Sequence, residues 1–387
     1  MHVVGHALCV MGATYACFAA WVVERRHRRR RRAKATLGAA VSVLKPLCGE
    51  EPHLFENLET FCRQTYASYQ LVFGVRSPAD RAIAVVERLR IAHPERDIAL
   101  VVDERIHGSN LKVSNLINMM VHARHDRFVI ADSDIFVDPY YLSEVTEPLN
   151  DREVGVVTCL YHARSVAGFW AQMGGQFIDG WFAPSVHVAA ALGSSRFGFG
   201  ATLALRRDTL DAIGGFASLR DRLADDYWLA ELARQKGLRT VLSEVMVGTD
   251  VVEQHFTHLW QRELRWLRTI RVLNPVGFTF VFVTFSWPLL VAGASLSHTA
   301  GSVALAVIGG TARVLTHWRT RQVAGARPPR IRELALAPMR DLLIATQWMA
   351  AFTGDHVLWR NDRLPLRDLP QEATNEASLL PTCKSTV

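Results

Sequence analysis

The stretch RFVIADSDIFVDP, residues 127–139, is the best guide to the fold of this chain. Its apolar run 128–131 stops at Asp132-Ser133-Asp134, the pattern of a short buried strand that ends at the rim of a sheet. Open α/β sheets bind ligands at that rim. Two carboxylates there need a positive neighbour, and Mg²⁺ or Mn²⁺ carrying a diphosphate would supply one. The alternative is a solvated loop in which an aspartate caps the next helix.

The overall composition excludes one class of partner. The chain has 387 residues, enough for one large catalytic domain with additional segments. Its formal net charge is +7, but eight Arg and Lys residues lie from Arg25 to Lys34, and the rest of the chain carries only −1. One basic run does not make a basic face, so we predict no nucleic-acid partner. The six cysteines form no CxxC pair, which favours free thiols in a reducing compartment.

Apolar segments stand near both ends of the chain. Residues 3–23 carry no charge and are long enough to cross a bilayer of about 30 Å. Positive charge follows this segment, which favours an anchor over a cleaved signal peptide and places the next residues in the cytoplasm. Residues 275–296 and 299–312 would form a membrane hairpin. Residues 334–353 would be a further span or a re-entrant or interfacial helix, because two charges interrupt them.

Between these ends the pattern alternates between strand and helix. Strands are expected at 41–47, 70–75, 98–103, 127–132, 154–161 and 201–207, and helices at 52–64, 79–91, 112–123, 223–236 and 256–272. Such units predict a doubly wound, mostly parallel, Rossmann-like sheet with helices on both faces. The expected order is an N-terminal anchor at 1–24, a basic cytoplasmic linker at 25–40, a catalytic domain at 41–272, membrane helices at 273–355 and a tail at 356–387.

Four polar motifs fall at the edges of these elements. They are Asp80, Asp132 with Asp134, Asp225 with Asp226, and the set Arg262, Arg265 and Trp266. The last set shares one helical surface because its members are three and four residues apart. Each motif also has a plainer explanation. Asp80 and one of the adjacent aspartates would suit helix caps, and Arg with Trp is common where a helix meets a membrane.

In this order and spacing the motifs resemble the D, DxD, D and (Q/R)xxRW signature of GT-A glycosyltransferases of family 2, and more closely family 21, the ceramide glucosyltransferases. The stretches similar to family 21 are VSVLKPLCGEEPHLFENLETF (41–61), LKVSNLINMM (111–120), ADSDIFV (131–137), GGFASLRDRLADDYWLA (214–230) and LRWLRTIRV (264–272). Within family 21, the chain most resembles the bacterial hopanoid-associated branch. The stretches that carry this resemblance are AIAVVERLR (82–90), VVTCLYHARSVAG (156–168) and ELRWLRTIR (263–271). The resemblance implies a GT-A catalytic domain over about residues 41–275.

The resemblance also implies roles for these residues. Asp132 and Asp134 would hold Mg²⁺ or Mn²⁺ on the diphosphate of a UDP-sugar, and Asp226 would act as the general base. Ceramide glucosyltransferases typically have Asp-Ser-Gly at the second motif, so Asp134 is a departure toward the commoner DxD. The remaining expected contacts are Asp80, Lys112, Asp132 and Arg265 with the nucleotide donor, and Asp225, Arg262 and Trp266 with the acceptor or diphosphate.

The expected protein is a multi-pass, inverting glycosyltransferase of the bacterial inner membrane with a cytoplasmic catalytic domain. The branch resemblance favours transfer of N-acetylglucosamine from UDP-GlcNAc to a hopanoid polyol such as bacteriohopanetetrol. A ceramide glucosyltransferase that uses UDP-glucose is the alternative within the class. From another class, the chain could be an inactive membrane scaffold that still binds nucleotide, although the presence of all four acidic sites argues against this.

Overall fold

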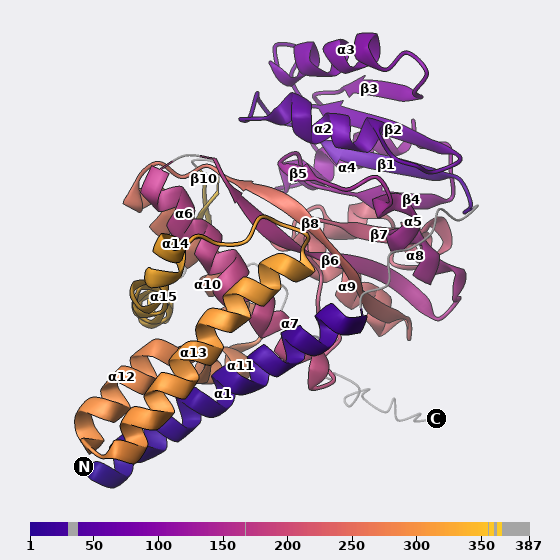
Figure 1. The fold of residues 1–387 in the computed structure, drawn as a ribbon. Helices are drawn as coiled ribbons and strands as arrows, with labels where there is room; N and C mark the ends of the chain where they lie inside the picture. Colours follow the sequence, from indigo (N-terminus) through magenta and orange to yellow (C-terminus); the bar gives the residue numbers. More distant parts are fainter. Residues whose placement is uncertain (30–37, 167, 355, 360–361, 366–387) are drawn as a thin grey trace, which may run out of the picture.

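The structure, a computed structural model, describes residues 1–29, 38–166, 168–354, 356–359 and 362–365 (Figure 1). Parts of the expected basic linker and of the expected tail therefore lie outside the described residues. An eight-stranded sheet forms the centre of residues 41–251, in the order β3-β2-β1-β4-β7-β6-β8-β5. Its strands are β1 (Val41–Pro46), β2 (Tyr69–Val75), β3 (Ile98–Val102), β4 (Arg127–Ile130), β5 (Ile135–Phe136), β6 (Val154–Ser165), β7 (Leu203–Arg206) and β8 (Arg239–Val251).

Two of the eight strands, β7 and β5, run opposite to the other six. β3, β2, β1 and β4 are parallel neighbours, as the alternating pattern predicts. β7 then runs antiparallel to both β4 and β6, and β5 runs antiparallel to β8. β6 and β8 pair in parallel, so six of the eight strands, all except β7 and β5, point in the same direction. The sheet is therefore mixed but mostly parallel, as predicted.

Alternating side chains bury both faces of this sheet. In β1, Val43 packs into the core on one face and Leu44 into the core on the other, because successive residues of a strand point to opposite sides. One face is covered by α2 (Leu54–Cys62), α3 (Ala82–Ala92) and α5 (Tyr141–Thr146). The other is covered by α4 (Leu111–Met120), α8 (Arg207–Ala212) and α9 (Asp225–Gln235). Short 3₁₀ turns, η1 (Glu147–Asn150) and η3 (Phe216–Leu219), complete the connections.

A second group of helices lies beside the far half of the sheet. It contains α6 (Gly168–Gln176), the π-helical turn η2 (Phe177–Phe182), α7 (Ala183–Ala191) and α10 (Phe256–Leu273). No helix or strand was predicted for residues 168–191 or for β8. Near the end of the described chain, β9 (His356–Trp359) pairs with β10 (Asp362–Pro365).

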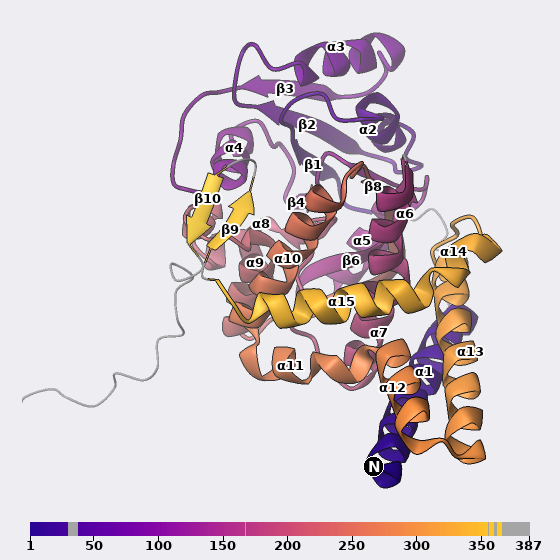
Figure 2. The ribbon, with the colours of Figure 1, turned by 90° about the vertical axis from the view of Figure 1, so that its left-hand side faces the viewer.

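Three helices extend from the sheet region as a bundle: α1 (His2–Arg29), α12 (Ser286–Ser297) and α13 (Ala300–Val323) (Figures 1 and 2). Small residues allow them to pack closely; a Cβ atom on Gly5 would lie 2.6 Å from the backbone nitrogen of Ser297. Among the described residues, α1 alone is long and apolar enough to cross a membrane as one helix. The segment α11 (Pro275–Thr279), η4 (Phe280–Thr284) and α12 passes the same test only as a pair bent by 58°.

The last apolar stretch forms α14 (Ile331–Ala335) and α15 (Ala337–Ala351). Figure 2 shows α15 lying across the bundle axis, beside α10. Its 15 residues span about 22 Å, less than the apolar thickness of a bilayer. Its two charges are buried in protein, Arg340 against Glu263 and Asp341 against Arg313. At this length α15 does not pass the test for a membrane span among the described residues.

Candidate active site

Lys112 is the cation around which the predicted carboxylates gather. The side chain of Asn110 caps the start of α4, which directs Lys112 toward the edge where β4 ends. Its Nζ lies 2.7 Å from Oδ1 of Asp132 and 3.5 Å from Oδ2 of Asp225. Burial alone would lower the pKa of Lys112, but the charges of Asp132, Asp225 and Asp226 outweigh it and raise the pKa. The ammonium group therefore stays charged and links the second motif to the third.

Gly200 links Asp132 to Asp226. Its backbone N–H donates to Oδ2 of Asp226 (2.8 Å), and its carbonyl accepts from the backbone N–H of Asp132 (3.3 Å). A Cβ atom at this position would lie only 2.7 Å from Oδ2 of Asp132, so any larger residue would displace that carboxylate. The N–H of Tyr227 donates to the other oxygen of Asp226 (2.8 Å) and fixes the carboxylate. Burial, with the neighbouring charge of Asp225, raises the pKa of Asp226 to about 6.

Asp134 lies beside Asp132 in an acidic environment. Its Oδ2 accepts a hydrogen bond from the hydroxyl of Thr249 on β8 (2.7 Å). Burial, followed by the charge of Asp132, raises the pKa of Asp134 to about 7. No group of three or more His, Cys, Asp or Glu within the described residues could hold a metal ion. Two carboxylates nevertheless suit Mg²⁺ or Mn²⁺ bound to a nucleotide, because phosphate oxygens and water complete the shell.

Lys45 is a site residue that the sequence analysis missed. It is completely buried at the end of β1, and its Nζ donates to the backbone carbonyl of Asp132 (2.8 Å) and lies 3.8 Å from the ring centre of Phe61. Burial lowers the pKa of Lys45 to about 7, against the opposing charges of Asp134 and Asp132. A lysine inside the otherwise apolar run VSVLKPL was the signal that could have identified it.

Asp80 stands one residue before Arg81, the N-cap of α3, and its side chain bonds to backbone amides. Its Oδ1 accepts from the backbone N–H of Ala82 at the start of α3 (2.9 Å). Both of its oxygens also accept from the N–H of Gly49, which follows β1 (2.9 and 3.1 Å). Because β1 and β2 are parallel, Asp80 lies at the same edge of the sheet as Asp132, but its present partners are backbone amides.

The fourth motif lies on α10 and reaches the site through aromatic rings. The ring of Trp266 packs against Phe182 (6.4 Å between centroids), and Phe182 packs against Phe199 (5.5 Å), the residue before Gly200. Arg262 stacks over Trp266 (5.2 Å) and pairs with Glu253 (2.6 Å) instead of a site carboxylate. Arg265 is half-buried on the same helix.

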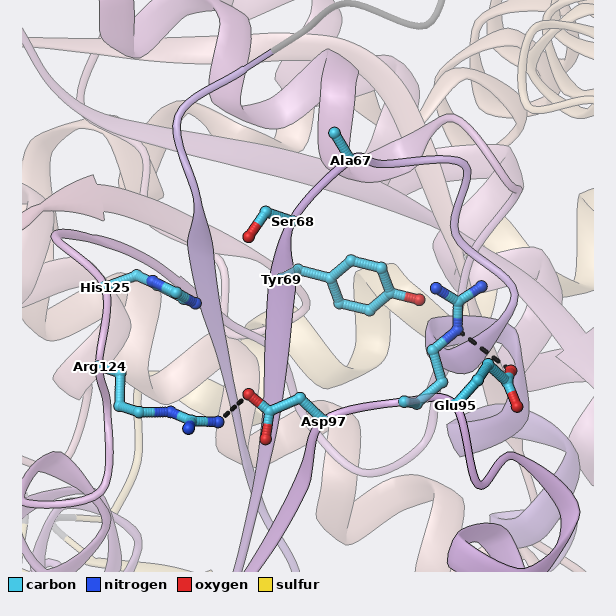
Figure 3. A pocket seen from close by; sticks show the side chains of 8 residues that line it. Ala67, Ser68, Tyr69, Glu95, Asp97, Arg124 and His125 are labelled. Carbon is cyan, nitrogen blue, oxygen red and sulfur yellow. Dashed lines mark hydrogen bonds and ion pairs between the residues drawn. The ribbon is translucent and has the colours of Figure 1, made fainter.

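A separate cavity of about 390 Å³ lies at the opposite edge of the sheet (Figure 3). It is lined by residues at the amino ends of parallel strands, among them Tyr69 at the start of β2 and His125 just before β4. An ion pair between Arg124 and Asp97 crosses its lining (Figure 3). Because the carboxylates lie at the carboxyl ends of these strands, this cavity is not part of the candidate active site.

Comparison with known proteins identifies the family of this fold. The model of glycosyl transferase family 21 matches residues 4–371, almost the whole chain. The chain belongs to glycosyl transferase family 21. Its relatives include ceramide glucosyltransferases 1 and 3 of Caenorhabditis elegans, which are 30% and 24% identical over 61% and 67% of this chain. The matches cover 50% and 57% of those proteins, so the chain spans about half the length of the curated relatives.

The chain also resembles a solved structure. A mannosyltransferase from Pyrobaculum calidifontis, solved in complex with GDP-Man and Mn²⁺, superimposes with a TM-score of 0.50 at 20% identity, covering 91% of this chain and 97% of that chain. At this identity the likeness establishes the fold alone. The expected GT-A-like fold of family 21 is therefore confirmed, with a mixed sheet in which only β7 and β5 run against the other strands.

Proposed function

We propose that this family 21 member is an inverting glycosyltransferase that moves a hexose or N-acetylhexosamine from a UDP-sugar to a lipid hydroxyl. The observation that carries the proposal is the connection of Asp132, Lys112 and Asp226 at one sheet edge, with Gly200 contacting both carboxylates. A donor diphosphate at Asp132 and a base at Asp226 would then stand on either side of a sugar. Displacement of a sugar from a diphosphate requires that arrangement.

Asp226 is the proposed general base. A lipid hydroxyl becomes a good nucleophile as its proton leaves, and a fixed carboxylate takes that proton in the transition state. The hydroxyl oxygen bonds to the anomeric carbon while the bond from that carbon to the diphosphate breaks, and UDP leaves. Attack from the face opposite the leaving group inverts the anomeric centre. The two backbone N–H donors on Asp226 hold it in place while leaving room on each oxygen for the proton.

The donor contacts are proposed for Asp80, Lys112, Asp132 and Arg265, with Asp132 and Asp134 holding Mg²⁺ or Mn²⁺. When bound, the cation would offset the negative charge that develops on the leaving diphosphate. Lys112 is placed to exchange its carboxylate partners for phosphate oxygens, because its ammonium group is already at the same edge. Trp266 and Arg262, with Asp225, are proposed to line the acceptor side.

The acceptor is proposed to arrive from a membrane. The apolar helix α1 would anchor the chain in the bacterial inner membrane. The basic run at 25–34 would stay on the cytoplasmic side and so place the catalytic region in the cytoplasm. The segments α11 to α13 follow α10 directly. The aromatic wall formed by Trp266, Phe182 and Phe199 therefore stands next to the most apolar part of the protein. A lipid held at the membrane surface could then present its hydroxyl to Asp226.

The resemblance to the hopanoid-associated branch leads us to propose UDP-GlcNAc and a hopanoid polyol such as bacteriohopanetetrol as substrates. A second candidate is ceramide glucosylation from UDP-glucose, because the curated relatives are ceramide glucosyltransferases. A mass-spectrometric assay of the purified chain with both sugars and both lipids separates them. Product with ceramide but not with the hopanoid would overturn the preferred acceptor.

An inactive nucleotide-binding scaffold remains the alternative from another class. The variant Asp226→Asn separates it from an enzyme, since it keeps the shape of the side chain but removes the base. An enzyme of the proposed kind should lose turnover by about 10²- to 10⁴-fold while it still binds the UDP-sugar. Unchanged product formation would exclude Asp226 as the base, and no product from the wild type with any of the four substrates would favour the scaffold.

A further inference from the structure

A closed polar cluster lies between α10 and α15, outside the site described above. It consists of Glu263, Arg340 and Gln347, none of which has exposed surface. Nη2 of Arg340 lies 2.7 Å from Oε2 of Glu263, and Nη1 lies 3.3 Å from Oε1, a two-pronged contact that fixes the relative orientation of the two groups. Gln347 closes the cluster by donating to Glu263 (2.9 Å) and accepting from Arg340 (2.9 Å).

This cluster holds the helix that carries the fourth motif. Glu263 follows Arg262 and stands three residues before Trp266, so it belongs to the same turn of α10 but faces the protein interior. A second path leads from Arg340 to the same tryptophan: the guanidinium lies 5.3 Å from the ring centre of Phe177, and that ring packs 5.7 Å from Trp266. Arg340 therefore touches the turn of α10 and also the ring that supports its tryptophan.

A merely stabilising role explains the cluster poorly. Apolar side chains of similar volume usually stabilise a buried position at least as well as an ion pair does, because they avoid the desolvation of two charges. What an ion pair with two parallel hydrogen bonds adds is direction, since apolar packing has no preferred orientation. The cluster joins α15 to the helix that borders the candidate acceptor side, where the position of an aromatic wall matters.

We propose that Arg340, with Gln347, is a positioning residue that sets α10 so that Trp266 faces the acceptor. The inference rests on the proposed function, in which Trp266 lines the acceptor side. It assigns a use to the two charges that interrupt the last apolar stretch: Arg340 orients α10, while Asp341 binds Arg313 on α13.

The test replaces the pair without leaving an unpaired charge. In the double variant Glu263→Met and Arg340→Met, α10 and α15 keep an apolar contact but lose the two-pronged hydrogen bonding that fixes their relative orientation. The matched control is Arg313→Met with Asp341→Met, which removes the neighbouring buried pair (2.6 Å) between α15 and α13 but no contact with α10. Two measurements follow on the full chain in detergent: hydrogen exchange of the α10 amides, and the ratio of sugar transfer to lipid over hydrolysis of the UDP-sugar by water.

We expect the Glu263/Arg340 variant to exchange its α10 amides at least about tenfold faster than the wild type. Its transfer-to-hydrolysis ratio should fall about tenfold or more, because a displaced wall affects the acceptor more than the donor. UDP affinity should change by less than about threefold, and the control should match the wild type in both the α10 exchange and the ratio. Arg340→Lys, which keeps the charge without the two-pronged contact, should fall in between.

Wild-type values for the Glu263/Arg340 variant, or equal effects in the control, would overturn the inference. If that variant does not fold, Gln347→Leu keeps the ion pair and removes one of its supports, and it should shift both quantities in the same direction by a smaller factor; no shift would also overturn the inference. If the wild type transfers no sugar, the proposed function fails, while the hydrogen exchange still decides whether the cluster positions α10.

Discussion

Replacement of Gly200 by alanine is the sharpest test of the candidate site. The added methyl carbon would lie 2.7 Å from Oδ2 of Asp132 and 3.2 Å from Nζ of Lys112, whereas ordinary contact begins near 3.4 Å. The Asp132 carboxylate must therefore move by about 0.7 Å, away from its 2.7 Å contact with Lys112. The φ angle of Gly200 lies outside the left-handed region, so alanine introduces no backbone strain.

The expected loss follows from that displacement. A misplacement of about 1 Å at a reacting centre can lower the rate about 10²-fold. A shift of about 0.7 Å should therefore lower kcat about 10- to 100-fold, which corresponds to about 1.4–2.7 kcal/mol of transition-state stabilisation. The backbone N–H of residue 200 is retained, so its bond to Asp226 remains available. The melting temperature should change little.

The assay measures UDP release and lipid product with the purified chain, together with thermal unfolding. Gly301→Ala is the matched control, because its Cβ would meet nothing closer than 3.8 Å, and it should keep wild-type kcat. A Gly200→Ala protein with kcat within about twofold of the wild type would refute the reasoning. It would mean that the close approach of Gly200 to Asp132 does not belong to the donor site.

Three further predictions address the base, the cation and the attachment of the apolar helices. Burial and Asp225 raise the pKa of Asp226 to about 6, and a general base must be ionised to act. We therefore expect kcat to be level above pH 6 and to fall about tenfold per pH unit below it. The same fall at low pH in the residual activity of Asp226→Asn would contradict the role of Asp226 as the base. Asp134→Asn should raise the Mg²⁺ or Mn²⁺ concentration for half-maximal activity about tenfold or more, and an unchanged requirement would exclude Asp134 as a ligand. Asp179→Asn removes the buried charge that pairs with Arg321 and should lower the free energy of unfolding by about 3–5 kcal/mol. Arg152→Gln, which breaks an exposed pair, is the control and should lower it by less than about 1 kcal/mol. Equal losses of unfolding free energy in the two variants, measured by thermal unfolding, would contradict the importance of the buried pair.

The sequence predicts the first half of the sheet well and the second half poorly. The strands β1, β2 and β4 are short apolar runs between turn residues, and such runs identify buried strands wherever they occur. The direction of β7 could not be predicted, because LALR has the same pattern in a parallel and in an antiparallel strand. No strand was predicted at β8, because its middle, LSEVM, interrupts the apolar run with a serine and a glutamate.

The site shows the same division between local and long-range signals. Asp132, Asp134 and Asp226 stand out in the sequence because carboxylates follow a strand or begin a helix. The part of Gly200 does not, because it depends on a loop meeting the start of α9, 26 residues away. The role of Arg340 could not be predicted either. The sequence shows a charge within an apolar stretch, but its partner Glu263 lies on α10, far away in the chain.

The site holds more acidic than basic side chains. Fully ionised, Asp132, Asp134, Asp225 and Asp226 would carry four negative charges against the two positive charges of Lys45 and Lys112, which leaves the site negative. The raised pKa of Asp134 and the lowered pKa of Lys45, each about 7, remove opposite charges in equal measure, so the negative excess remains near pH 7. A nucleotide diphosphate is itself negative, so the bare anion would be repelled at close range, whereas an anion that brings a divalent cation is attracted. The acidic site would thereby select the cation-bound donor, while the neutral hydroxyl of a lipid acceptor is unaffected by the same field.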